Sequence, residues 1–97
     1  MLAFIREKVP MEELLAQAAE EAVELSHAAL KMRRCMDGKN PTPVRLSEAV
    51  ANLEEEIADV LLCLETLGYD MRELSRYRAM MDAKLERWAG RLIDAEV

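Results

Sequence analysis

Two short acidic segments carry the residues of this sequence best suited to chemistry. The first is Glu20-Glu21-Ala22-Val23-Glu24, and the second is Glu56-Ile57-Ala58-Asp59. Each contains two carboxylates three residues apart, a spacing that places both on one face of a helix. One member of each pair also falls where apolar residues otherwise repeat. Carboxylates gathered there lose hydration and repel one another, so the pattern indicates that a cation offsets their charge.

The predicted ion is Mg²⁺, with Mn²⁺ as an alternative. Mg²⁺ prefers oxygen ligands and keeps several waters, which suits an incomplete cage of carboxylates, and no cluster of Cys or His competes for this role. If the two helices pack antiparallel through their apolar stripes, both pairs converge at one edge of the core. The predicted metal ligands are Glu21, Glu24, Glu56 and Asp59.

The first acidic pair lies on a long predicted helix. Pro10 suits a first helical turn, and no helix-breaking residue follows until the segment that starts at Asp37. The apolar stripe of this helix, over residues 11–36, repeats at intervals of three and four residues. Its members are Leu14, Ala18, Leu25, Ala28 and Met32, with Glu21 among them.

The second pair lies on another predicted helix, which starts with Thr42 as cap and Pro43 in the first turn, or alternatively near Ser47, and stops at Gly68. Asp70 to Glu73 reads as a capping box that opens a third helix. The residues of that helix expected in the core are Leu74, Tyr77, Met81, Leu85, Trp88 and Leu92. The predicted fold is all-α: one domain over residues 1–97, an antiparallel bundle of three main helices completed to a four-helix-type core by oligomerisation.

Composition restricts the partners. The chain has 97 residues, 52% of them hydrophobic, and a net charge of −6. A hydrophobic fraction this high in a small helical domain predicts that part of the surface is buried against a second copy of the chain, and an acidic chain is poorly suited to a nucleic-acid polymer. Cys35 and Cys63 lie within predicted helices without CxxC spacing, which favours reduced thiols and a cytoplasmic location. The chain starts with too few apolar residues for a signal peptide or membrane span, so no membrane association is expected.

The two acidic segments together resemble the EExxE...ExxD pattern of the MazG-like, all-α nucleoside triphosphate pyrophosphohydrolases. The resemblance covers roughly residues 12 to 90 and includes Asn40-Pro41-Thr42-Pro43-Val44 and Glu55-Glu56-Ile57-Ala58-Asp59-Val60-Leu61. It implies Mg²⁺ binding by Glu21, Glu24, Glu56 and Asp59, with Glu20 in at most a helping role. It also implies assembly as dimers or tetramers, and hydrolysis of a nucleoside triphosphate to monophosphate and pyrophosphate, clearing non-standard or excess nucleotides.

Such a substrate also requires basic groups for its phosphates. Lys31 is available on the first long helix, and Lys84 and Arg87 look like the Lys and Arg often found in the last helix of this family. Trp88 is a candidate for stacking on a base, or else a core residue. The segment from Asp37 to Val44 is either a substrate-contacting flap or only a connector.

Two other functions fit parts of the sequence. Glu24 and His27 form an ExxH, the spacing used by di-iron helical bundles, although the second acidic segment offers ExxD instead of a second ExxH. The other alternative is a non-enzymatic helical dimer or adaptor, whose acidic helices pair with a basic partner and whose methionines form an adaptable surface. Metal dependence separates the enzyme from the adaptor.

Overall fold

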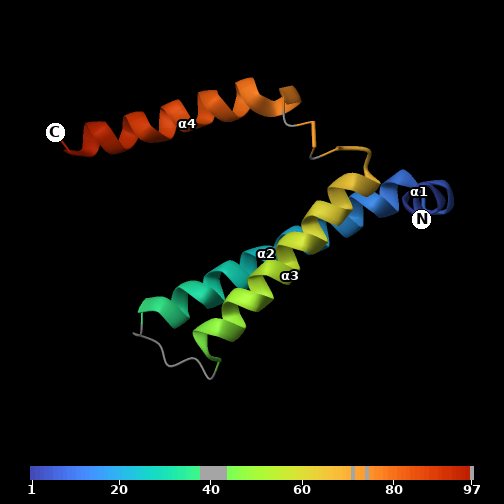
Figure 1. Ribbon diagram of the computed structural model, residues 1–97, viewed down its shortest axis with the longest axis horizontal. Coiled ribbons are helices and arrows are strands. Elements are labelled where there is room, and N and C mark those ends of the chain that lie inside the picture. The colour runs from blue at the N-terminus through green and yellow to red at the C-terminus, as the bar shows by residue number, and fades with distance from the viewer. Residues whose placement is uncertain (38–43, 71, 74, 97) are drawn as a thin grey trace.

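The computed structural model describes residues 1–37, 44–70, 72–73 and 75–96. These residues form four helices and no strand, which confirms the all-α class (Figure 1). Helix α1 spans Leu2–Lys8 and α2 spans Met11–Asp37, followed by α3 over Leu46–Thr66 and α4 over Ser75–Glu96. Measured against the length and hydropathy that a bilayer crossing needs, every helix in this described part of the chain falls short.

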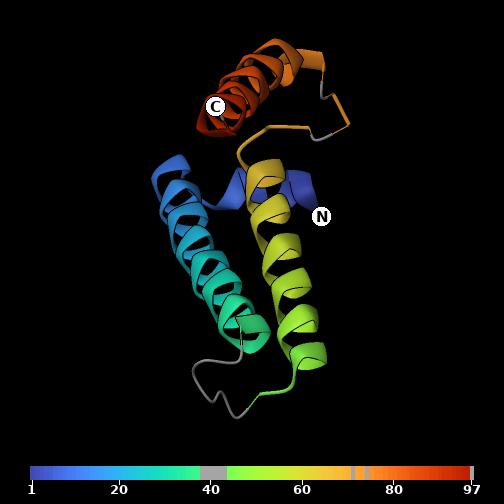
Figure 2. The ribbon, with the colours of Figure 1, turned by 90° about the vertical axis from the view of Figure 1, so that its left-hand side faces the viewer.

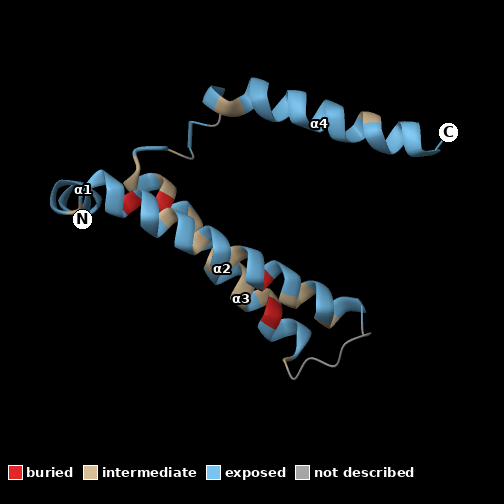
Figure 3. Ribbon diagram, turned by 180° about the vertical axis from the view of Figure 1, so that it is seen from behind, coloured by how far each residue is buried: buried red, intermediate tan, exposed pale blue. Residues whose placement is uncertain are grey.

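Helices α2 and α3 form an antiparallel hairpin, the main packing unit of the chain (Figures 1 and 2). Its buried residues fall in two groups, one toward each end of the pair (Figure 3). Leu14 and Cys63 are buried near α1, and Ala28 and Ala49 are buried near the opposite end, where the Cys35 thiol donates to the Val44 carbonyl at 3.5 Å. The half-buried carboxylates Glu21 and Glu56 lie between these groups, at the middle of the helix pair.

The start of α3 differs from the first prediction. Thr42 and Pro43 lie outside the described residues, but Val44 and Arg45 are described and are not helical, so α3 begins at Leu46, close to the alternative start at Ser47. The predicted stop is confirmed. Gly68 has φ +98°, and its amide donates to the Glu65 carbonyl. The Tyr69 amide donates to the Leu64 carbonyl, so the two bonds together form a Schellman motif.

The third predicted helix starts later than the capping box indicated. A capping box needs the Asp70 carboxylate to accept from the Glu73 amide, yet this carboxylate accepts from the backbone amide of Arg72 at 2.8 Å and from its guanidinium. These bonds hold the pKa of Asp70 below its ordinary value. Because Asp70 is committed to Arg72, the chain turns there, and α4 begins at Ser75.

Helix α4 does not cover the α2–α3 hairpin within one chain. It stands apart from both helices in the two views at right angles (Figures 1 and 2), and an aromatic contact, Tyr69 with Tyr77 at 6.4 Å between ring centroids, lies near its start. Trp88 and Leu92, predicted to face the core, are 60% and 59% exposed. Met81 and Leu85 are also exposed, and the side chain of Leu74 lies outside the described residues. Tyr77 is half-buried, but from Met81 onward the predicted core side of α4 is not covered by any of the described residues.

Candidate metal centre

The candidate site is a cluster of three carboxylates supplied by the facing sides of α2 and α3. One carboxylate oxygen from each of Glu21, Glu56 and Asp59 lies within 4.8 Å of the other two. Glu21 and Glu56 are half-buried and Asp59 is exposed, so the cluster opens from the helix interface toward solvent. Three of the four predicted metal ligands are therefore brought together from segments more than thirty residues apart.

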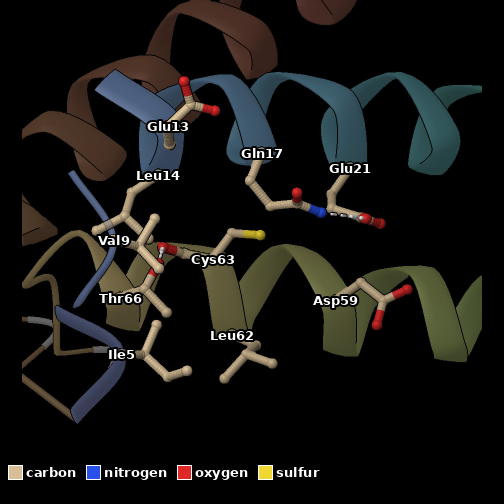
Figure 4. A pocket seen from close by; sticks show the side chains of 10 residues that line it. All are labelled: Ile5, Val9, Glu13, Leu14, Gln17, Glu21, Asp59, Leu62, Cys63 and Thr66. Atoms are coloured by element: carbon tan, nitrogen blue, oxygen red, sulfur yellow. Dashed lines mark hydrogen bonds between the residues drawn. The ribbon is translucent and has the colours of Figure 1, made fainter. Parts of the chain in front are cut away.

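The carboxylate of Glu21 is held in place by its own helix. Gln17 lies one turn earlier on α2, and its Nε2 donates to Glu21 Oε1 at 3.0 Å (Figure 4). A carboxylate oxygen carries two lone pairs, so this bond orients the group and leaves acceptor capacity on both oxygens. In Figure 4, Glu21 and Asp59 come from the two facing helices at the same end of the cavity.

Glu56 is the most perturbed member of the cluster. Its Oε2 has no exposed surface and accepts no hydrogen bond from the described residues. Lost hydration and the nearby negative charges raise the pKa of Glu56 above its ordinary value. These charges belong, in decreasing order of effect, to Asp59, Glu21, Glu24 and Glu55. An unpartnered carboxylate oxygen surrounded by like charge is the environment that a bound cation would relieve.

A cavity of about 450 Å³ adjoins the cluster between α1, α2 and α3 (Figure 4). Glu21 and Asp59 line one end of this cavity, and its other walls are mainly apolar. Those walls include Ile5, Val9, Leu14, Leu62 and Cys63. Burial, and then the charges of Glu21 and Asp59, raise the pKa of the Cys63 thiol, so it remains protonated beside the cluster.

Glu24 and Glu20 lie outside the three-carboxylate cluster. Glu24 is exposed and was predicted as a ligand, but the cluster does not include it, although its charge contributes to the raised pKa of Glu56. Three residues rotate an α-helix by about 300°, so Glu24 lies about 60° around α2 from Glu21. Glu20 is also exposed, and nothing in the described part of the chain gives it a role.

Lys31 and His27 are not positioned to act at the cluster. Lys31 is half-buried on α2, but ten residues of helix separate it from Glu21, a rise of about 15 Å. His27 is exposed, and among the described residues no histidine joins the carboxylates as a metal ligand. The arrangement is therefore a set of oxygen donors without the histidines that the di-iron alternative requires.

The remaining predicted substrate residues lie on α4, away from the carboxylates of the same chain. Lys84, Arg87 and Trp88, together with Arg91, line a separate hollow of about 370 Å³. No residue of α4 lines the cavity beside the cluster. Their side chains form a basic surface with an aromatic ring, but one chain does not place that surface next to the candidate metal ligands.

Sequence reasoning missed two features of the site. Gln17 was not predicted, although its place four residues before Glu21 is a spacing at which helical side chains meet. Ile5 and Val9 were also missed, because their position at the cavity depends on how α1 packs against the hairpin, which helical periodicity does not specify.

Comparisons of the chain with protein-family models, with curated proteins and with solved structures gave no match.

Proposed function

We propose that this chain is a Mg²⁺-dependent nucleoside triphosphate pyrophosphohydrolase, which converts a nucleoside triphosphate and water to the monophosphate and pyrophosphate and so removes non-standard or excess nucleotides. The observation that carries the proposal is the convergence of Glu21, Glu56 and Asp59 within 4.8 Å from two helices. The resemblance of the same segments to the EExxE...ExxD pattern supplies the reaction.

The donor set fits a hard divalent cation. All three side chains offer carboxylate oxygens, and Glu56 Oε2 has no partner among the described residues. Three protein ligands leave coordination positions for water and substrate phosphates, as Mg²⁺ sites in phosphoryl-transfer enzymes do. When bound, the ion would neutralise charge on the phosphate oxygens and lower the pKa of a coordinated water. Mn²⁺ would fit the same donors.

The residues of the chain have separate tasks in this proposal. Gln17 fixes the carboxylate of Glu21 through the 3.0 Å hydrogen bond. Glu56 would hold the ion through its carboxylate, whose Oε2 has no partner among the described residues, and its second oxygen would accept a proton from an attacking water. Asp59 is the exposed member of the cluster and would meet the incoming phosphates first. Glu24 would add charge at longer range, and Glu20 would help at most.

The neighbouring cavity suits the nucleoside part of the substrate. Its volume of about 450 Å³ lies within the usual range for small-molecule pockets, about 300–1,000 Å³. Ile5, Leu14 and Leu62 provide an apolar surface for a base, while the triphosphate would lie at the end formed by Glu21 and Asp59. The substrate would thus bind with its base at the apolar end of the cavity and its triphosphate at the acidic end.

The cationic residues needed for the phosphates would come from α4. Lys84, Arg87 and Trp88 form the basic hollow with Arg91, and in a homodimer or homotetramer α4 of one copy would serve the cluster of another. Lys31, which lies on the hairpin itself, would contribute only long-range electrostatic attraction for the phosphates. The proposed active enzyme is therefore an oligomer, in which one copy supplies the cationic residues and another supplies the carboxylate cluster.

The direct test is pyrophosphate release from a panel of standard and modified nucleoside triphosphates, with Mg²⁺ or with EDTA. The proposal predicts metal-dependent release of pyrophosphate in equal amounts with the monophosphate. No release from any nucleotide by a folded protein would count against it.

An adaptor is the second candidate, favoured by the exposed apolar residues of α4. Met80, Met81, Leu85 and Trp88 are all at least 40% exposed and would suit docking to another protein. Addition of Mg²⁺ separates the two functions, because an adaptor should gain no thermal stability from the ion and should tolerate Glu21→Gln with Asp59→Asn.

A further inference from the structure

The cavity beside the carboxylate cluster has two ends of different chemistry. Glu21 and Asp59 line one end, and Glu13 and Thr66 lie toward the other end in Figure 4. Glu13 precedes Glu21 by eight residues of α2, which is a rise of about 12 Å. If the phosphates bind at Glu21 and Asp59, the base of the same nucleotide extends toward Glu13 and Thr66. We call the end at Glu13 and Thr66 the base end of the cavity.

The two polar side chains of the base end accept hydrogen bonds and have no donor to offer. The Thr66 hydroxyl donates its hydrogen to the Cys63 carbonyl at 2.7 Å, which leaves the lone pairs of Oγ1 as acceptors. Glu13 has no partner among the described residues, and an ionised carboxylate only accepts. Its carboxylate points outward from the rim of the cavity (Figure 4). Because exposed side chains change rotamer within nanoseconds, it can turn toward a bound base.

The backbone amides at the base end are already bonded within the chain. The Val9 amide donates to the Ile5 carbonyl at 2.9 Å. The amides of Glu13 and Leu14 both donate to the Pro10 carbonyl, at 3.0 and 3.1 Å. Pro10 itself has no N–H. In the described part of the chain, no Lys, Arg or His lines the cavity, so a base that reaches this end meets acceptors and apolar groups.

The edge of the base decides how well it fits such an end. An exocyclic amino group carries two N–H donors, one for the Glu13 carboxylate and one for Thr66 Oγ1. A carbonyl in the same place would lose hydration and face two acceptors, which costs binding free energy. Cytosine and uracil differ by this exchange of amino group for carbonyl, and so do adenine and hypoxanthine. Acceptance from the cytosine amino group by a carboxylate is also a recurrent contact in base recognition.

We infer that Glu13 and Thr66 select nucleotides whose base carries an exocyclic amino group, so that cytosine and adenine nucleotides are preferred to uracil and hypoxanthine nucleotides. The inference rests on the proposed function, because phosphates bound at the carboxylate cluster orient the base. Gln17, in the middle of the cavity, has both a free acceptor and a second N–H, and the Cys63 thiol is only a weak donor. Neither residue favours one edge strongly. Among non-standard nucleotides, those that keep the amino group are therefore better substrates than deaminated ones.

The first test compares kcat/KM within two matched pairs in Mg²⁺, CTP with UTP and ATP with inosine triphosphate. Wild type should prefer the amino member of each pair by about 5- to 150-fold, the discrimination expected of a well-placed pair of hydrogen bonds. Thr66→Val keeps the shape of the side chain but removes the acceptor, so the preference should fall. Glu13→Lys replaces an acceptor with a donor, so the preference should reverse.

Glu12→Lys is the matched control for Glu13→Lys. It makes the same change of charge on the neighbouring residue of α2, which does not line the cavity. Both members of each nucleotide pair carry the same triphosphate, so an effect of charge on the phosphates cancels in the ratio. The Glu12→Lys ratios should therefore equal those of wild type.

A second test needs no hydrolysis. Cytidine and uridine would be titrated into the metal-free protein while the methyl NMR signals of Ile5 and Leu62, in the cavity wall, are followed. Cytidine should saturate the shifts at the lower concentration. Equal kcat/KM within each pair, or an unchanged ratio in Glu13→Lys, would overturn the inference and leave the pyrophosphohydrolase standing. If no nucleotide is hydrolysed, the proposed function fails, and equal or tighter binding of uridine would then overturn the inference as well.

Discussion

Glu56→Gln should stabilise the metal-free protein and remove most of the stabilisation that Mg²⁺ gives to wild type. The pKa of Glu56 is raised from 4.5 in the folded chain, so the folded chain binds this proton more tightly than the unfolded chain does. The ionised carboxylate therefore destabilises the fold at pH values above the raised pKa, and this penalty disappears below pH 4.5. The neutral amide of the variant removes this destabilisation. Without metal, Glu56→Gln should therefore be more stable than wild type at pH 7, and the difference should disappear as the pH falls to 4.

The effect of Mg²⁺ follows from binding to the folded state alone. At about 10 mM Mg²⁺, a site with a dissociation constant of about 1 mM stabilises the fold by about 1.4 kcal/mol. For a domain of this length that corresponds to a rise in Tm of roughly 6–11 °C. Glu56→Gln removes the only cluster carboxylate that has an unpartnered buried oxygen among the described residues, so most of this rise should be lost.

Thermal unfolding followed by circular dichroism at 222 nm measures both effects. Wild type, Glu56→Gln and the matched control Glu54→Gln would be compared in EDTA and in Mg²⁺, with about 30 mM NaCl to match the ionic strength of the metal-free samples. Glu54 is outside the cluster, so its variant should respond to Mg²⁺ as wild type does. An equal rise in Tm for Glu56→Gln and wild type would refute the assignment of Glu56 as a ligand.

Three further predictions concern the surroundings of the site. Leu14→Ala removes a side chain that is 6% exposed at the cavity wall, and chemical denaturation should show a loss of about 2–5 kcal/mol in the free energy of unfolding. Gly68→Ala should cost about 1–2 kcal/mol in the same assay, because φ is +98° and the new Cβ would lie 3.1 Å from Arg6 Nη2. Cys63 has a raised thiol pKa and little exposure, so at pH 8 a disulfide reagent should modify it more slowly than glutathione, and unfolding should remove the difference. A glutathione-like rate in the folded protein would contradict this burial.

Local sequence signals predicted the helices well where the signal lies within the helix itself. Pro10 and an unbroken run of helix formers placed α2 almost to the residue, and Gly68 marked the end of α3. The predicted start of α4 was wrong because two donors, the Arg72 groups and the Glu73 amide, compete for the Asp70 carboxylate, and the sequence does not show that Arg72 takes it.

Helical spacing predicted three members of the site but not its full composition. Glu21 and Glu56 were found because a carboxylate within an apolar stripe is expected to face the neighbouring helix, and Asp59 because it lies three residues after Glu56. Spacing alone did not separate Glu24, because residues three apart share a face only within about 60°. The position of Trp88 was also beyond this reasoning, since periodicity identifies an apolar side of α4 but not the surface that covers it.

Pyrophosphate release by three proteins would decide whether the carboxylate cluster holds a catalytic metal ion. Wild type, Glu56→Gln and Glu54→Gln would be assayed in Mg²⁺ and in EDTA with the nucleotide that wild type hydrolyses fastest. Wild type and Glu54→Gln should release pyrophosphate in Mg²⁺ only, and Glu56→Gln should release none despite an unchanged helical spectrum. Undiminished release by folded Glu56→Gln, or release that persists in EDTA, would contradict a metal centre at these carboxylates.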